Sequence, residues 1–173
     1  MIKIHRVIAA TVVAVGAALT TAQAQGPTPN ACAAPERRKF DFWIGEWEVK
    51  AAAGTTVGKS SVQSIAGGCG MLENWTAGNG GSGKSLNAYN PVSKQWQQYW
   101  VGQGGAVTEY RESTWTDGSL SLIARGSAPS AAPIQRLTFT PVNDTTVRQH
   151  GEQSADNGAT WTTTYDFYYY RRR

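Results

Sequence analysis

The sequence predicts an all-β domain of about ten short antiparallel strands that close into an up-and-down barrel. Three observations support this prediction. Apolar and polar residues alternate over short segments, as they do on half-buried strands, and Gly, Asn, Asp and Pro residues mark turns between the segments. No segment of ten or more residues shows the apolar periodicity of a helix. A barrel is favoured over a sandwich because a closed sheet has no unpaired edge strand.

The domain begins with the aromatic-rich segment Phe40–Val49. Residues 37–43 are expected to form one helical turn that carries aromatic side chains on one side. Gly45 then lets the chain turn sharply into a strand, in which Trp47 and Val49 alternate with charged residues. We expect the aromatic side chains to plug one end of the barrel.

Turn signals divide the rest of the chain into strands. Asp117-Gly118 and Asn157-Gly158 are strong signals for two-residue hairpins, because both residue types tolerate positive φ angles. The strands are expected at residues 45–52, 56–66, 70–77, 84–90, 94–101, 105–113, 119–126, 134–141, 145–154 and 160–171.

Gly45-Glu46-Trp47 resembles the Gly-x-Trp motif in the first strand of lipocalins and other calycins. In that superfamily the tryptophan packs under an arginine or lysine from the end of the last strand, and residues 171–173 are all arginine. The wider pattern, over residues 32–173, resembles a group of secreted bacterial proteins of unknown function. This resemblance implies a calycin-like barrel and export, and it implies no known activity. The segments that carry it are FDFWIGEWEV, GGC, LENW, SLNAYN, WQQYW, VRQ and SADNGATW.

Residues 1–24 are typical of a signal peptide. Lys3 and Arg6 form a basic start, residues 7–19 form an apolar run, and Ala22-Gln23-Ala24 is a suitable cleavage site. The apolar run is too short for a membrane-spanning helix, and no other candidate span follows. We therefore expect a periplasmic or secreted protein without stable membrane insertion.

The remaining chain is expected to be a Pro- and Ala-rich linker over residues 25–36 and a single barrel domain over residues 37–173. The whole chain has 16 basic and 12 acidic residues, and loss of Lys3 and Arg6 with the signal peptide lowers the basic count by two, to 14. This near balance predicts no nucleic-acid partner.

Cys32 and Cys69 are the two cysteines of the chain. In an exported protein, two cysteines most simply form a disulfide. This bond would close a loop of roughly 38 residues and stabilise the fold by about 4 kcal/mol in the chain-entropy model. The alternative, a redox-active pair, lacks the close C-x-x-C spacing.

Two short segments match motifs of other functions. Residues 78–85 match the phosphate-binding pattern GxxxxGK[ST], but a strand-like segment ending at Pro91 follows where a helix is needed. We interpret them as a glycine-rich hairpin loop at the barrel mouth. Residues 154–161 match the Asp-box S-x-D-x-G-x-T-W of sialidase propellers. A single copy cannot build a propeller, so we interpret this segment as a capped hairpin.

The fourth and fifth expected strands carry the most informative side chains. Asn87 and Tyr89 share one face of the fourth strand, and Gln98 and Trp100 share one face of the fifth. We expect these faces to point inward, because tryptophans outside a barrel would need cover; the alternative is a surface aromatic ladder. Aromatic walls with a few amides are typical of small-ligand pockets. The expected ligand-binding residues are Trp47, Asn87, Tyr89, Gln98, Trp100, Tyr110 and Arg148.

Histidine offers little chemistry, because His5 leaves with the signal peptide and only His150 remains. One histidine cannot build a zinc site of several histidines, so we expect no metal site. Some calycin-like barrels bind haem through one histidine, which makes His150 a candidate haem ligand. An exposed strand histidine is the preferred interpretation, and no cofactor is expected.

The sequence thus predicts a protein that binds a small apolar or aromatic molecule inside the barrel. One alternative is a metal-independent lyase or isomerase that uses an inward carboxylate and a tyrosine, with unknown catalytic residues. Candidate groups on the later strands are Glu109, Tyr110, Arg111, Arg148, Gln149 and Glu152, which structural Arg–Glu pairing would also explain. The other alternative is an envelope interaction protein that uses exposed aromatic residues and the terminal arginines. The sequence predicts no particular oligomeric state.

Overall fold

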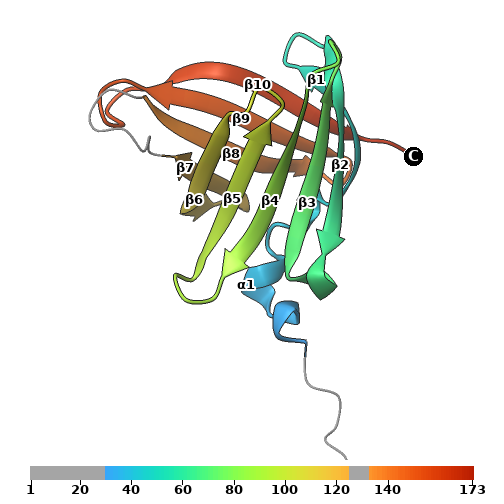
Figure 1. Ribbon diagram of the computed structural model, residues 1–173, viewed down its shortest axis with the longest axis vertical. Helices are drawn as coiled ribbons and strands as arrows, with labels where there is room; N and C mark the ends of the chain where they lie inside the picture. The colour runs from blue at the N-terminus through green and yellow to red at the C-terminus, as the bar shows by residue number, and fades with distance from the viewer. Residues whose placement is uncertain (1–29, 125–132) are drawn as a thin grey trace, which may run out of the picture.

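The computed structural model describes residues 30–124 and 133–173, so the expected signal peptide lies outside the described residues. Ten antiparallel strands form one closed barrel (Figure 1). Each strand pairs with its neighbours in the sequence, and the first strand pairs with the last. The strands are β1 (Gly45–Ala51), β2 (Thr56–Ile65), β3 (Gly70–Ala77), β4 (Ser82–Asn90), β5 (Gln95–Gly102), β6 (Val107–Thr116), β7 (Ser119–Ala124), β8 (Ile134–Asn143), β9 (Thr146–Ser154) and β10 (Thr162–Arg171).

This architecture confirms the predicted up-and-down barrel, and the strand ends within the described residues differ from the expected ones by a few residues. The expected end of the seventh strand, at residues 125 and 126, lies outside the described residues. The largest difference is in β6, which continues to Thr116 instead of ending at residue 113. A shift in the pairing of β6 with β7 between Glu112 and Thr114 lets the strand continue past this point.

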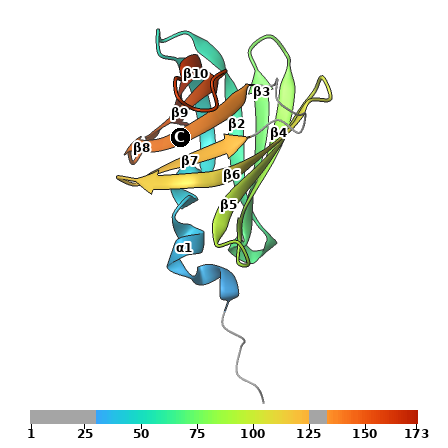
Figure 2. The same cartoon turned by 90° about the vertical axis from the view of Figure 1, so that its left-hand side faces the viewer.

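Short helical segments close one end of the barrel, as both views show (Figures 1 and 2). They are a 3₁₀ turn (Ala31–Ala33), the helix α1 (Pro35–Arg38) and a second 3₁₀ turn (Asp41–Trp43). The expected single turn over residues 37–43 is therefore divided in two, and its α-helical part begins at Pro35, inside the expected linker. Proline suits the first turn of a helix because its φ angle is already helical and its missing N–H has no partner there.

The aromatic plug expected at this end is present. The rings of Phe40 and Trp43 stack with their centroids 5.3 Å apart. The ring of Phe139, on β8, lies 4.7 Å from that of Trp43, and the ring of Trp96, on β5, lies 5.4 Å from that of Phe40. All four side chains are at most 3% exposed, so this end of the barrel is filled.

The junction of β1 and β10 has the arrangement that the Gly-x-Trp resemblance implies. The Arg171 guanidinium lies 4.4 Å from the centre of the Trp47 ring, and its Nη1 donates a hydrogen bond of 3.0 Å to the Ile44 carbonyl oxygen. Gly45 has a φ angle of 152°, and a Cβ there would collide with the Arg171 guanidinium. Arg171 is therefore a fixed part of the barrel and not a member of a free basic tail.

The predicted disulfide between Cys32 and Cys69 is formed. It connects the N-terminal segment to the turn between β2 and β3 (Ala66–Gly68). The Asn30 side chain also donates a hydrogen bond of 3.0 Å to the Gly67 carbonyl oxygen. These bonds hold the plug segment against the barrel end.

The Asp-box segment is a capped hairpin between β9 and β10, as expected. The Asp156 carboxylate accepts hydrogen bonds from the Thr160 backbone N–H at 2.8 Å and from the Thr160 hydroxyl at 2.6 Å. The Trp161 indole donates to the Gly158 carbonyl oxygen at 3.1 Å. In the other motif, a turn over residues 78–81 leads directly into the strand β4, so the helix of a phosphate-binding loop is missing there.

Candidate ligand cavity

Alternate residues of β4 and β5 point into the barrel, on the faces that the sequence pattern predicts to be inward. Ser85, Asn87 and Gln98 are at most 2% exposed, whereas Leu86 and Tyr99 on the opposite faces are 49% exposed. The inward orientation of these two strands is therefore confirmed, and the surface aromatic ladder is not formed.

The inward side chains change in character along the barrel axis. Along β3, Met71 belongs to the buried core, Glu73 comes next, and Trp75 follows towards the end opposite α1. Along β5, the order is Trp96 in the aromatic plug, then Gln98 and Trp100. The interior is therefore apolar at the closed end next to α1, polar in the middle, and lined by aromatic side chains towards the opposite end.

A cavity of about 450 Å³ occupies the part of the barrel that lies away from α1. Volumes of roughly 300–1,000 Å³ are usual for small-molecule sites. Its lining reaches Val57, Ala77 and Ala106, which lie at the strand ends away from α1. Its wall includes Trp75, Trp100, Leu137, Tyr165 and Phe167, and its polar lining includes Glu73, Gln98, Tyr110, Gln149 and Tyr169.

Two of the wall tryptophans lie where the neighbouring strand has a glycine. A Cβ at Gly83 would collide with the Trp100 ring, and a Cβ at Gly58 would stand 2.7 Å from Cη2 of Trp75. These glycines leave space for the rings against the barrel wall. A side chain at either position would have to displace a tryptophan, which would change the shape of the cavity.

Glu73 provides the carboxyl group at the base of the cavity. It is 2% exposed, and its two oxygens accept hydrogen bonds from the Ser60 hydroxyl at 2.9 Å and the Ser85 hydroxyl at 3.0 Å. Burial raises the pKa of Glu73 to about 7, against the lowering effect of these hydrogen bonds. Near neutral pH the group is therefore present in both its neutral and its charged form.

Glu73 has no charged partner among the side chains that the structure describes. None of the ion pairs formed by these residues includes it. Its third neighbour is the Tyr169 hydroxyl, at 3.5 Å, which lies closer to the Gln149 side-chain oxygen, at 2.9 Å. Glu73 is thus held by neutral donors alone.

A chain of hydrogen bonds connects Glu73 to Gln98. The Asn87 amide donates to the Ser85 hydroxyl oxygen at 2.9 Å, and the Gln98 amide donates to the Asn87 side-chain oxygen at 2.8 Å. This chain fixes the orientation of each group and uses the nitrogen end of the Gln98 amide. No side chain in the described part of the chain donates a hydrogen bond to the Gln98 oxygen, so this acceptor can bind a donor in the cavity.

The tyrosines of the lining remain protonated at physiological pH. Burial raises the pKa of Tyr110 to about 12, and its hydroxyl donates a hydrogen bond of 2.6 Å to the Gln135 side-chain oxygen. Burial also raises the pKa of Tyr165 and of Tyr169 above the ordinary value. These phenols are therefore neutral polar groups and not phenolate bases.

Three of the residues predicted to bind a ligand line the cavity: Gln98, Trp100 and Tyr110. Asn87 does not line it but bonds directly to Gln98. Glu73 is not among the predicted binding residues, although its alternation with Met71 and Trp75 indicates the same inward face.

The other three predicted residues lie elsewhere. Trp47 is fully buried towards the closed end, where its indole donates to the Trp43 carbonyl oxygen at 2.9 Å. Tyr89 lies near α1, with the Arg37 guanidinium 5.5 Å from its ring centre. Arg148 lies on the outer face of the barrel.

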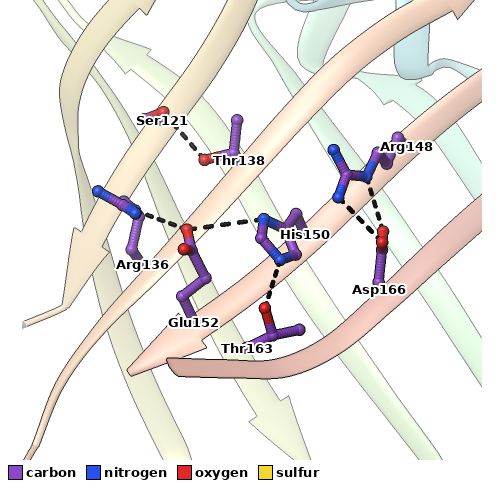
Figure 3. A network of polar contacts seen from close by, with 8 residues as sticks. All are labelled: Ser121, Arg136, Thr138, Arg148, His150, Glu152, Thr163 and Asp166. Carbon is purple, nitrogen blue, oxygen red and sulfur yellow. Dashed lines mark hydrogen bonds and ion pairs between the residues drawn. The ribbon is translucent and has the colours of Figure 1, made fainter. Parts of the chain in front are cut away.

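The outer face of β8, β9 and β10 carries a separate polar network (Figure 3). Arg148 forms two hydrogen bonds with Asp166, at 2.7 and 2.9 Å. Arg136 binds Glu152 at 2.7 Å, and His150 lies between Glu152 and Thr163, with its Nε2 2.9 Å from the Thr163 hydroxyl. The candidate haem ligand His150 therefore points away from the cavity, and the arginines and carboxylates of this face pair with one another.

No model of a known protein family matches this chain, and no curated protein matches it. The resemblance to calycins therefore rests on the barrel and on the packing of Arg171 over Trp47. In the described ranges, no helix is long and apolar enough to cross a membrane. Nor do three or more His, Cys, Asp or Glu side chains of these ranges form a group suited to a metal ion.

Proposed function

We propose that this protein binds a small, largely apolar molecule in the cavity of its barrel. The observation that carries the proposal is a cavity of about 450 Å³ with an aromatic wall and a few polar groups at its base. Ligand pockets have this composition, whereas the interior of a small barrel without a ligand is filled by side chains. In this barrel, buried aromatic side chains fill the end next to α1, and among the described residues the cavity lies beyond them.

The cavity lining also indicates how a ligand is oriented. The apolar part would contact Trp75, Trp100 and Phe167, which lie towards the end opposite α1. The polar part would point to Glu73 and Gln98 at the base. A molecule with one polar end and an aromatic or aliphatic body fits this arrangement.

The proposal is tested by the binding of N-phenyl-1-naphthylamine. This apolar dye fluoresces in apolar environments from which water is excluded. The matched variants are Thr108→Phe, which adds a ring inside the cavity, and Val107→Phe, which adds it outside, where Val107 is 53% exposed. We expect the wild type to bind the dye, Thr108→Phe to bind it about tenfold more weakly or not at all, and Val107→Phe to behave as the wild type. Absence of binding, or equal affinity of the two variants, would contradict the proposal.

One observation, the buried carboxyl group of Glu73, favours a second function. A carboxyl with a pKa of about 7 at the wall of a cavity is suited to general acid or base catalysis, as in a lyase or isomerase. Mass spectrometry of the gently purified protein separates the two functions. A bound molecule that is released unchanged after long incubation supports binding, whereas its conversion by the wild type and not by Glu73→Gln supports catalysis.

A further inference from the structure

The base of the cavity has the properties of an anionic site. Hydroxyl groups of Ser60 and Ser85 approach both oxygens of Glu73, and hydroxyl donors stabilise the charged form of a carboxyl. The chain that ends at Gln98 adds an amide oxygen with acceptor capacity. A donor group of a ligand would therefore meet two acceptors at this end of the cavity.

The wall above this base is suited to a positive charge as well. Trp75, Trp100, Tyr165 and Phe167 line it, and the rings of Tyr165 and Phe167 stack with centroids 4.7 Å apart. Aromatic faces attract ammonium groups, most strongly those of tryptophan, and the attraction increases when water is excluded.

Above about pH 7, the carboxyl of Glu73 is mainly charged, and this charge is already buried in the free protein, where it lacks a cationic partner among the described residues. The cost of removing the carboxylate from water is therefore part of the folding free energy and not of the binding free energy. A cationic ligand has to lose only its own hydration, and it gains a charge partner that a neutral ligand cannot use.

We infer that the ligand of the cavity is an apolar or aromatic amine, whose protonated amino group lies against Glu73 and whose body contacts the aromatic wall. This inference rests on the proposed function, since it names the class of ligand for the same cavity. A carboxylate ligand of similar shape would be rejected, because two like charges would meet in a dry site.

Three probes that share a naphthalene ring test the inference. They are the amine 2-(1-naphthyl)ethylamine, the alcohol 2-(1-naphthyl)ethanol and the carboxylate of 1-naphthaleneacetic acid. Affinities are measured by calorimetry at about pH 8.5, where Glu73 is charged. We expect the amine to bind about tenfold more tightly than the alcohol, and the carboxylate to bind most weakly. In Glu73→Gln, the amine should lose about tenfold in affinity while the alcohol changes by less than about twofold.

Glu109→Gln is the matched control, because Glu109 is paired with Arg111 on the outside of the barrel. It should keep the preference for the amine. Binding of the dye by Glu73→Gln would show that the cavity of this variant is intact. Equal affinity of the amine and the alcohol in the wild type, or an unchanged amine affinity in Glu73→Gln, would overturn the inference. Dye binding without amine preference would leave the proposed function standing, whereas loss of all binding would refute both.

Discussion

Replacement of Glu73 by glutamine is expected to remove a pH dependence from the stability of the barrel. Glutamine has nearly the same shape, and its amide can accept from one serine hydroxyl and donate to the other. In the wild type, the folded state must bury a carboxylate at high pH, whereas the unfolded state keeps it in water. The variant has no charge to bury.

The magnitude follows from the two pKa values of the wild-type carboxyl, 4.5 in its ordinary state and about 7 in the fold. Because the folded state holds the proton more strongly, stability is highest below the lower value and falls as the pH rises through the higher one. The shift corresponds to about 3 kcal/mol in total, of which about 2 kcal/mol is lost between about pH 5.5 and pH 8.5.

Urea unfolding followed by tryptophan fluorescence at about pH 5.5 and pH 8.5 measures this loss. The wild type should lose about 2 kcal/mol more than Glu73→Gln over this range. Asp41, with its pKa raised by burial, and Glu152 and Asp166, with pKa values lowered by hydrogen bonds from arginines, are present in both proteins, so their effects cancel. Equal losses in the two proteins would refute the assignment of a raised pKa to Glu73.

Three further changes have defined outcomes. Arg171→Ala should lower the free energy of unfolding by about 1–3 kcal/mol, since it removes a cation–π contact and a hydrogen bond to a backbone carbonyl; urea unfolding measures this, and an effect no larger than that of Arg173→Ala would contradict it. Reduction of the Cys32–Cys69 disulfide should cost about 4 kcal/mol in the same assay, and a loss below about 1 kcal/mol would disagree with the chain-entropy account. Gly83→Val should push the Trp100 ring from the wall and weaken dye binding about tenfold, whereas Gly104→Val, at a position with open space around it, should leave dye binding unchanged; similar affinities of these two variants would count against the role of the glycine.

The sequence predicted the strands well because alternation reports directly which face of a strand is buried. It did not report the height of a side chain along the barrel axis. Tyr89 and Gln98 occupy inward faces of paired strands, yet Tyr89 lies near α1 and Gln98 lines the cavity. A strand crosses the whole barrel, so an inward residue can belong to the plug or to the cavity.

Polar interiors also make the choice of face ambiguous. Arg148 and Gln149 are adjacent polar residues on β9, and alternation requires that they point to opposite sides. The structure places Gln149 at the cavity and Arg148 against Asp166 on the outside. Glu73 was overlooked for a related reason, since an inward carboxylate among Met71 and Trp75 is unusual without a cation beside it.

The junction of β1 with β10 has a consequence for the order of folding. Nine of the ten strand pairings join neighbours in the sequence, and the tenth joins the two ends of the domain. Its contacts include the bond from Arg171 to Ile44, which spans 127 residues. Hairpins can form early, but the two edges stay unpaired until the last strand arrives, and closing so long a loop is entropically slow. A chain that lacks its final residues would thus expose both edges to pairing with other chains, so aggregation should be the characteristic defect of C-terminal truncation.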